Sequence, residues 1–229
     1  MGISPDIAIR IAFGTSLLVI LPTAISGTWG HNKRKAIRWK TTLTLGSCGL
    51  LGALIGATLA ARLPNKILEI GFGGLVLAVA LWMGLGRIPK LKKEAEEPWE
   101  NFRLVAACGF PIGIVTGLTG VGGGVLIIPT LILALNFPMR IAIGTSVASI
   151  IFTSIGGIIG YIVNGLGVSG LLPYSLGYLN LPIWLCLAAT SIPLAQLGAR
   201  AAHALPAKQL RYIFIAFMVY SGLRMIGVF

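Results

Sequence analysis

Long apolar stretches, separated by short polar or proline-containing segments, dominate the pattern of the chain. Their lengths are close to the span of about 17–25 residues that an α-helix needs to cross a bilayer. Eight segments are predicted, at residues 7–29, 41–61, 65–86, 103–120, 121–136, 140–163, 181–203 and 207–228. The segments 103–120 and 121–136 are short and meet at a glycine cluster, so the pattern leaves open two full crossings or one re-entrant pair.

Tight helical hairpins are predicted where proline ends one segment and begins the next, at Leu63-Pro64 and at Leu205-Pro206. The stretch 87–102 is the one strongly polar part of the chain and is predicted to lie outside the bilayer. Hydrophobic residues make up 56% of the 229 positions and charged residues 10%, whereas soluble domains carry about 25% charged residues. The predicted fold class is therefore all-α, a polytopic bundle of about seven or eight segments in a lipid bilayer.

Part of the sequence occurs twice. Residues 10–20, RIAFGTSLLVI, return as RIAIGTSVASI at 140–150, with seven of eleven positions identical. The sequence GATLAARLPNKIL at 56–68 returns as GARAAHALPAKQL at 198–210, with seven of thirteen identical. The first pair is offset by 130 residues and the second by 142, as one duplicated unit with an insertion would be. In an apolar chain, such a duplication is typical of transporters.

The duplication divides the chain into a first repeat at 1–86, a polar cytoplasmic linker at 87–102 and a second repeat at 103–229. Basic residues then predict the topology, because lysine and arginine collect in cytoplasmic loops. If the two short segments before residue 137 return the chain to its starting side, fourteen basic residues fall on one face and four on the other. A single crossing gives eleven and seven. The sharper split favours the return, and it accounts for the net charge of +12 without a nucleic-acid partner.

This topology makes the two repeats inverted. The segment 7–29 begins on the outer face, whereas its repeat partner at 140–163 begins on the cytoplasmic face. Inverted repeats are related by a pseudo-twofold axis in the membrane plane, and they build transporters that open alternately to the two sides. The sequence therefore predicts a transporter.

The sequence GLTGVGGGVLIIP at 117–129 places five glycines within eight positions. Because each glycine destabilises a helix interior by about 1 kcal/mol, a helix break is predicted here. Backbone N–H groups at the start of the following helix favour an anion, and the glycines Gly122–Gly124 have no side chains to hinder its approach. The alternative is close helix packing through small residues, which is the interpretation given to Gly52. Valine at Gly123 is accordingly expected to abolish anion flux without loss of folded protein, and alanine at Gly52 to be mild.

The second polar element is the repeated sequence Gly-Thr-Ser at 14–16 and 144–146, one to two turns inside its predicted helix. Serine and threonine in such a place can bond back to a carbonyl one turn earlier. Their retention in both repeats while most neighbours differ favours a symmetric polar lining of a transport path. The sequence leaves both interpretations open.

Groups suited to catalysis or metal binding are scarce in the predicted spans. Of six carboxylates, only Glu69 lies near a span, and the two histidines are expected at the interface because they lie at helix ends. Three cysteines fall in apolar helices without metal-ligand spacing and are predicted to be small buried hydrophobic residues: Cys48, Cys108 and Cys186. No enzyme, metal or cofactor is predicted. Proton coupling is not required for anion export, because a negative interior favours it by about 2.3 kcal/mol per charge per 100 mV.

Residues 117–150, GLTGVGGGVLIIPTLILALNFPMRIAIGTSVASI, resemble the TauE/SafE family of membrane transporters, which is associated with export of sulfite and organosulfonates. The resemblance rests on the glycine-rich core, a proline, a short loop and the Gly-Thr-Ser segment, and it covers nearly the whole chain. It implies an anion path lined by the glycine break and the Gly-Thr-Ser segments. The implied substrate-binding residues are Gly120, Gly122, Gly123, Gly124, Thr145, Ser146, Thr15 and Ser16.

The resemblance implies that the first repeat, at 1–86, is incomplete at its N-terminus. Family members begin with a first glycine-rich hairpin, and the offset of 130 residues would place that hairpin before Met1. The expectation is a transporter of the inner or plasma membrane of a prokaryote that exports small anions such as sulfite or organosulfonates; the sequence also allows a homo-oligomer. The alternative is a non-transporting membrane partner, a truncated paralogue that associates with a complete transporter subunit.

Overall fold

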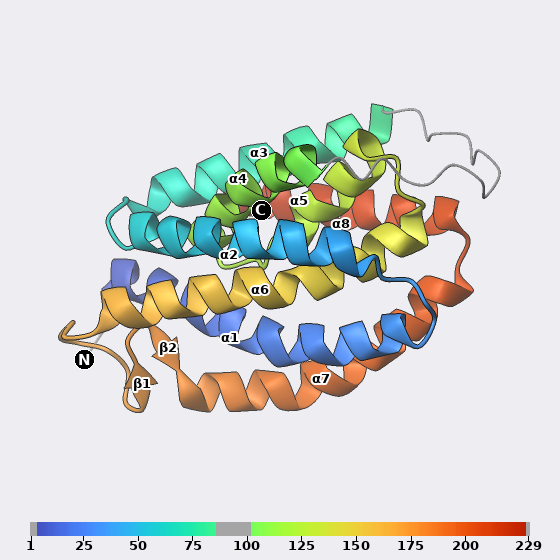
Figure 1. Cartoon of the computed structure of the whole chain (residues 1–229). Helices are drawn as coiled ribbons and strands as arrows, with labels where there is room; N and C mark the ends of the chain where they lie inside the picture. Colours follow the sequence, from blue (N-terminus) through green and yellow to red (C-terminus); the bar gives the residue numbers. More distant parts are fainter. Residues whose placement is uncertain (1–3, 86–101, 228–229) are drawn as a thin grey trace.

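The computed structural model describes residues 4–85 and 102–227, which form a bundle of helices with one small β-hairpin (Figure 1). Its elements are α1 (Pro5–Asn32), α2 (Trp39–Ala60), α3 (Asn65–Leu85), α4 (Phe102–Thr119), α5 (Gly124–Pro129), the π-helix η1 (Thr130–Ala134), α6 (Met139–Gly165), β1 (Ser175–Leu176), β2 (Leu179–Asn180), α7 (Leu181–Ala204) and α8 (Ala207–Ile226). Each predicted segment contains a helix within the described residues, and at 121–136 the helical part is Gly124–Ala134. The predicted linker lies, apart from its last residue, outside the described residues.

Five of the described helices are long and apolar enough to cross a membrane: α1, α2, α4, α6 and α7. The predicted segment 121–136 is shorter than that, because α5 and η1 together form one apolar helical segment, Gly124–Ala134. Pro129 lies where α5 passes into the π-helix, and proline there cannot donate the hydrogen bond that would continue the α-helical pattern. The sequence did not predict the hairpin of β1 and β2, whose second strand leads directly into α7.

Helices α2 and α6 pack side by side and run in the same direction. Along this contact, Gly156 of α6 lies against Leu50, and Gly160 lies against Leu54 further along. Helix α4 runs parallel to both of them (Figure 1). Because α4 and α6 share a direction, the intervening segment α5–η1 returns the chain to the end at which α4 began. The predicted return of the two short segments is therefore the arrangement found.

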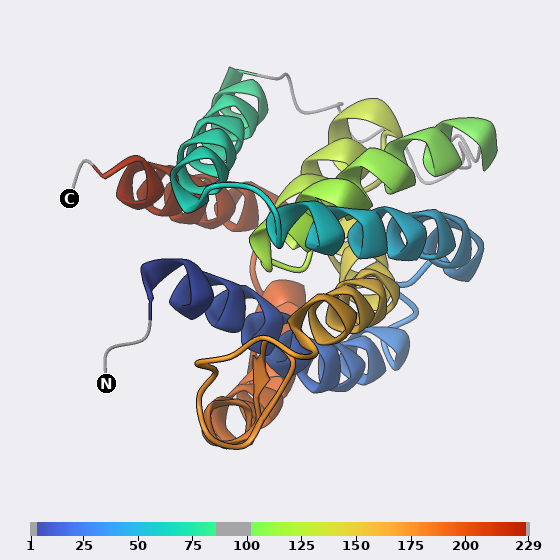
Figure 2. The same cartoon turned by 90° about the vertical axis from the view of Figure 1, so that its left-hand side faces the viewer.

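Helix α1 packs against α6 in the opposite direction. Gly14 of α1 lies beside Tyr161 near the end of α6, and Gly27 lies beside Val147 near its start. Helix α7 packs on another side of α1 and runs parallel to it (Figure 2). The two copies of the duplicated segment, in α1 and α6, are thus antiparallel neighbours.

Glycines form the contact between α2 and α4. A Cβ atom added at Gly52 would overlap the carbonyl oxygen of Phe110, and one at Gly113 would overlap the carbonyl oxygen of Gly49. The packing interpretation of Gly52 is confirmed. The expectation of a mild alanine substitution there is wrong, because the clash is with backbone, which cannot rotate away as a side chain can.

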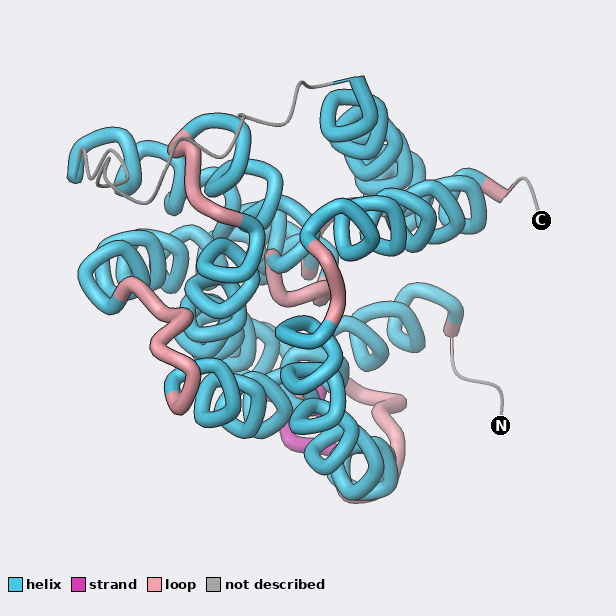
Figure 3. Tube along the Cα trace, turned by 90° about the vertical axis from the view of Figure 1, so that its right-hand side faces the viewer, coloured by secondary structure: helices cyan, strands magenta, loops and turns pink. Residues whose placement is uncertain are grey.

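Helices α3 and α8 form a separate antiparallel pair beside the rest of the bundle (Figures 2 and 3). Their contact is a small core of Val76, Ala80 and Met218. Large apolar side chains such as Leu81 and Phe217 are exposed on this pair, as lipid-facing residues would be.

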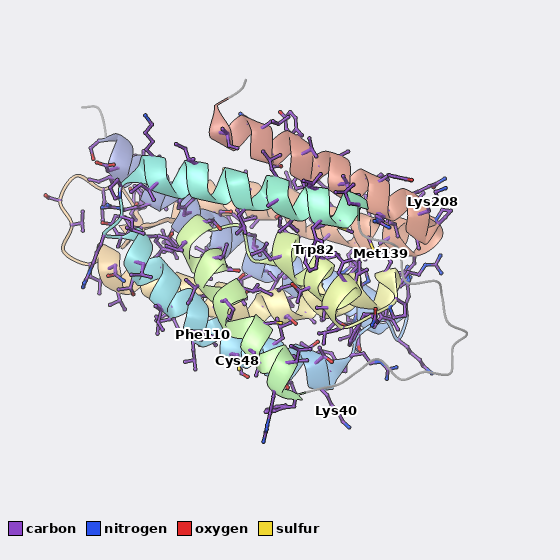
Figure 4. The ribbon with its side chains drawn as sticks, turned by 90° about the horizontal axis from the view of Figure 1, so that it is seen from above. Lys40, Cys48, Trp82, Phe110, Met139 and Lys208 are labelled. Carbon is purple, nitrogen blue, oxygen red and sulfur yellow. The ribbon has the colours of Figure 1, made fainter. Side chains whose placement is uncertain are left out.

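The two ends of the bundle differ in charge. One end holds the α1–α2 loop, the starts of α4, α6 and α8 and the end of α7, and Figure 4 shows Lys40, Met139 and Lys208 there together. The described basic residues at this end are Lys33, Arg34, Lys35, Arg38, Lys40, Arg103, Arg140, Arg200, Lys208 and Arg211. Those at the other end are Arg10, Arg62, Lys66 and Arg224. The asymmetry that the sequence predicted is therefore present in the described part of the chain.

Candidate functional site

The predicted helix break is confirmed between α4 and α5. Gly120, Gly122 and Gly123 have φ angles of +67°, +79° and +78°, in the left-handed region that side-chain-bearing residues rarely adopt. These three residues turn the chain back on itself so that α5 begins at Gly124. Glycine is therefore required at the break by the backbone conformation.

The break lies between the two copies of the duplicated segment. A Cβ atom at Gly122 would be 3.1 Å from the side chain of Ile20 in α1 and 3.4 Å from that of Ile150 in α6. Ile20 and Ile150 are equivalent residues of the two repeats, the last position of the matching eleven. Thr153 of α6 also donates a hydrogen bond of 3.4 Å to the carbonyl oxygen of Gly122. The glycine break is thus held at the contact between α1 and α6.

Hydrogen-bond donors collect at the start of α5. Apart from hydrogen bonds internal to a helix, the N–H groups of Gly122, Gly123 and Gly124 donate to no backbone carbonyl in the described part of the chain. The Ser146 hydroxyl of α6 is fully buried and has no hydrogen-bond partner, and it lies 3.9 Å from the position that a Cβ atom would take at Gly124. Buried polar groups are normally paired, so the unpaired Ser146 hydroxyl near the start of α5 needs an explanation, and a bound ligand would supply one.

The four glycines implied by the family resemblance are not equivalent. A Cβ atom at Gly120 would be 2.6 Å from the backbone of Phe13, and one at Gly123 would overlap the Thr116 hydroxyl. Both glycines are therefore needed for packing and for the turn. The expectation that valine at Gly123 leaves the fold intact is wrong. Gly124 differs, because its φ angle is not positive and its nearest neighbour is the movable end of Ile150, at 3.0 Å.

The two threonines of the repeated Gly-Thr-Ser segments have a role that the sequence did not predict. The Thr15 hydroxyl accepts a hydrogen bond of 3.0 Å from the backbone N–H of Asn180, the N-cap residue of α7. The Thr145 hydroxyl accepts one of 3.1 Å from the N–H of Arg38, the N-cap residue of α2. Each threonine therefore binds the first turn of a neighbouring helix. Arg38 and Asn180 are 142 residues apart, which is the second offset of the duplicated sequence. This offset is the signal that could have identified them as equivalent positions of the two repeats.

Ser16 lies apart from the glycine break, on a pocket of about 350 Å³ between α1 and α7. This pocket is lined mainly by apolar residues, with Thr15 and Ser16 on its α1 wall and Ile183 and Leu187 on its α7 wall. On α6 the position equivalent to Ser16 is Ser146, which is covered by the start of α5. The structure therefore brings Ser146 to the glycine break but leaves Ser16 on a different surface.

The described residues contain no group of three or more histidine, cysteine, aspartate or glutamate side chains that could hold a metal ion. Cys48 and Cys108 are half-buried. Cys186 is exposed on α7, so the prediction that all three cysteines are buried is wrong for this one. Helix α7 has most of its apolar surface uncovered in the bundle, which is why a cysteine within it need not be buried.

Comparison with known proteins gives the same family along most of the chain. Residues 3–225 match the family model described as sulfite exporter TauE/SafE. A probable membrane transporter protein of Methanocaldococcus jannaschii is 33% identical over 223 residues, covering 97% of this chain and 80% of that protein. A probable membrane transporter protein of Haemophilus influenzae is 30% identical over 226 residues, which cover 98% of this chain and 84% of that protein. Another probable membrane transporter protein, from Bacillus subtilis, is 29% identical over 176 residues, which cover 70% of this chain and 64% of that protein.

No solved structure matches the chain. The related proteins named above are probable membrane transporters, and the family is a transporter family rather than an enzyme family. With its apolar helices and its glycine break between two antiparallel copies of one segment, the chain belongs to the TauE/SafE family of membrane transporters.

Proposed function

We propose that this transporter exports small anions such as sulfite or organosulfonates, and that it binds them at the glycine break. The observation that carries the proposal is the unpaired, fully buried Ser146 hydroxyl, which lies 3.9 Å from the position that a Cβ atom would take at Gly124, the first residue of α5. An oxyanion has several acceptor oxygens, so it can take hydrogen bonds from the hydroxyl and the amide groups together. Donors aimed at a buried oxyanion are the general solution to anion binding without a metal.

The charge of the surroundings supports an anion over a cation. Residues 101–229, which contain the break and all of α6, include no aspartate or glutamate. Helix dipoles act in both directions at the break, because the segment Gly124–Ala134 has its N-terminal, partly positive end there and α4 has its C-terminal, partly negative end there. The preference for an anion therefore rests on the absence of carboxylates from residues 101–229.

Alternating access is the mechanism that the arrangement supports. The two copies of the duplicated segment run antiparallel, as copies related by a twofold axis in the membrane plane must. Each copy also binds the first turn of a helix from the other repeat, α1 to α7 and α6 to α2. We infer that residues 1–86 and 103–229 are inverted repeats that move against each other, with the basic end of the bundle on the cytoplasmic side of a prokaryotic inner or plasma membrane.

Flux through purified protein in liposomes tests this function. Vesicles loaded with radiolabelled sulfite, or with a radiolabelled organosulfonate, should lose label faster than protein-free vesicles when a membrane potential drives anions outward. A radiolabelled cation such as rubidium serves as the control and should be retained. Folded protein that moves neither anion under either polarity of the potential contradicts the proposed function.

A further inference from the structure

A small pocket lies between the starts of α2 and α4, at the basic end of the bundle. The two helices meet directly one turn further along, where a Cβ atom at Gly109 would be 2.7 Å from the carbonyl oxygen of Leu45. The pocket has a volume of about 140 Å³, roughly ten times what one water molecule needs, so it has room for a phosphate group. Its lining residues are Lys40, Thr41 and Thr44 of α2 and Phe102 and Val105 of α4.

The wall of this pocket contains an unpaired hydroxyl group. Thr41 is 3% exposed, and its hydroxyl has no hydrogen-bond partner. Thr44, on the same wall, is satisfied within the helix, because its hydroxyl donates to the carbonyl oxygen of Lys40 at 3.0 Å. Buried hydroxyls are normally paired, so the Thr41 hydroxyl points to an acceptor that a ligand in the pocket supplies.

The charge around the pocket favours an anionic ligand. Lys40 contributes an ammonium group to the wall. The first turns of α2 and α4 lie within the described residues, and neither contains an acidic side chain. Arg38, the N-cap residue of α2, makes no capping bond with its side chain. Because both helices begin at this end, their partly positive N-terminal ends add to the charge of Lys40.

The pocket also lies at the edge of the lipid-facing surface. Trp39, next to Lys40, is 47% exposed, and Phe102 on the opposite wall is 69% exposed. Leu43, one turn after Trp39, is 53% exposed. Exposed aromatic side chains beside basic residues are typical of the lipid headgroup level, with exposed aliphatic residues facing the hydrocarbon. A ligand with both a phosphate and an apolar part fits this mixed wall better than a free phosphate ion does.

We propose that this pocket binds the phosphate group of an anionic membrane lipid. The Lys40 ammonium and the Thr41 hydroxyl donate to the phosphate oxygens, and Phe102 packs against the glycerol and the first acyl carbons. One lipid then contacts both α2 and α4 and holds their starts together. None of the residues that line the pocket belongs to the proposed anion site, so this inference does not depend on the proposed function.

Purified protein in a neutral detergent tests the site with three probes: phosphatidylglycerol, phosphatidylcholine with the same acyl chains, and glycerol 3-phosphate. Native mass spectrometry reports bound lipid, and thermal unfolding reports the stabilisation that binding to the folded state produces. Phosphatidylglycerol should raise the unfolding midpoint by about 2–4 °C or more. Phosphatidylcholine should have less effect, because its choline cation neutralises the phosphate charge. An equal shift with phosphatidylcholine, or with glycerol 3-phosphate at the same concentration, overturns the assignment to an anionic lipid.

Two variants remove the ligand groups without altering the packing. Thr41→Val keeps the shape of the side chain and Lys40→Gln changes an exposed one, and each should weaken phosphatidylglycerol binding by about tenfold. Thr42→Val is the control for the first, because Thr42 is also buried and unpaired but does not line the pocket. Lys208→Gln, at the start of α8, is the control for the second.

Both controls should keep the affinity of the unaltered protein. Unchanged phosphatidylglycerol binding in Lys40→Gln and Thr41→Val overturns the proposal. Equal losses in Lys208→Gln and Lys40→Gln also overturn it, because they show a general attraction to the basic end rather than a site between α2 and α4.

Discussion

The hydroxyl of Thr15 accepts a hydrogen bond of 3.0 Å from the backbone N–H of Asn180, at the start of α7. The equivalent residues of the other repeat, Thr145 and Arg38, make the same bond at 3.1 Å. The threonines differ by 130 positions and their partners by 142, the two offsets of the duplicated sequence. The repeat therefore preserves a contact between helices, and not only a run of similar residues.

Replacing Thr15 or Thr145 with valine should destabilise the protein by about 1–3 kcal/mol, because each change leaves a backbone N–H without its acceptor, that of Asn180 at a buried position and that of Arg38 at a partly buried one. Serine at the same positions keeps the hydroxyl and should restore most of the stability. Thermal unfolding in detergent measures both. Both variants should lose stability, and Thr15→Val should lose more, because Asn180 is buried whereas Arg38 is exposed. A loss confined to one of them argues against a symmetric role.

Alanine at Gly52 should prevent normal packing of α2 against α4, since the new Cβ atom would overlap the carbonyl oxygen of Phe110. Alanine at Gly198 of α7 is the control, because nothing lies within 4 Å of the Cβ position there. It should be neutral or slightly stabilising, by up to about 1 kcal/mol from helix propensity. The amount of folded protein recovered by size-exclusion chromatography distinguishes them, and equal recovery contradicts the close contact.

Sequence patterns predicted the helices well because membrane spans depend on length and hydrophobicity, which are local properties. They also predicted the break at Gly120–Gly123, since several glycines so close together cannot continue a helix. They did not separate Gly123, which packs against Thr116, from Gly124, which lies beside Ser146. That distinction depends on which neighbour faces each glycine, and the neighbours belong to other helices.

Contacts between segments that are distant in the chain could not be predicted from the sequence either. His31 and His203 are each unremarkable residues at a helix end, and only the parallel packing of α1 and α7 joins them. The bonds of Thr15 and Thr145 were missed for the same reason, although the repeat offsets contained the information. A pattern within one helix does not state which helix lies beside it.

The basic end of the bundle is expected in the cytoplasm, and cysteine labelling can verify it. Lys33→Cys and Arg62→Cys, in a background without the native cysteines, lie at opposite ends of α2, which spans about 33 Å at 1.5 Å per residue. In intact cells, a membrane-impermeant thiol reagent should label the cysteine at 62 and spare that at 33. After lysis both should react. Labelling at 33 in intact cells contradicts the inverted topology.

Ser146→Ala tests the proposed anion site most directly, because stability and binding should respond in opposite ways. Removing a buried hydroxyl that has no protein partner should leave thermal stability unchanged or raise it by up to about 1 kcal/mol. If the hydroxyl donates to a bound anion, its loss should weaken anion binding by about tenfold or more, since hydrogen bonds to charged groups contribute about 1.5–3 kcal/mol.

Ser154→Ala is the matched control for this measurement. Ser154 lies further along α6, and its hydroxyl is also fully buried without a hydrogen-bond partner, but it is not among the residues beside Gly124. Its loss should affect stability in the same way as Ser146→Ala and leave anion affinity unaltered. Titration of the purified variants with sulfite, followed by liposome flux, separates the two serines. If Ser146→Ala binds and transports as wild type does, or if Ser154→Ala loses affinity equally, the anion site does not lie at the start of α5.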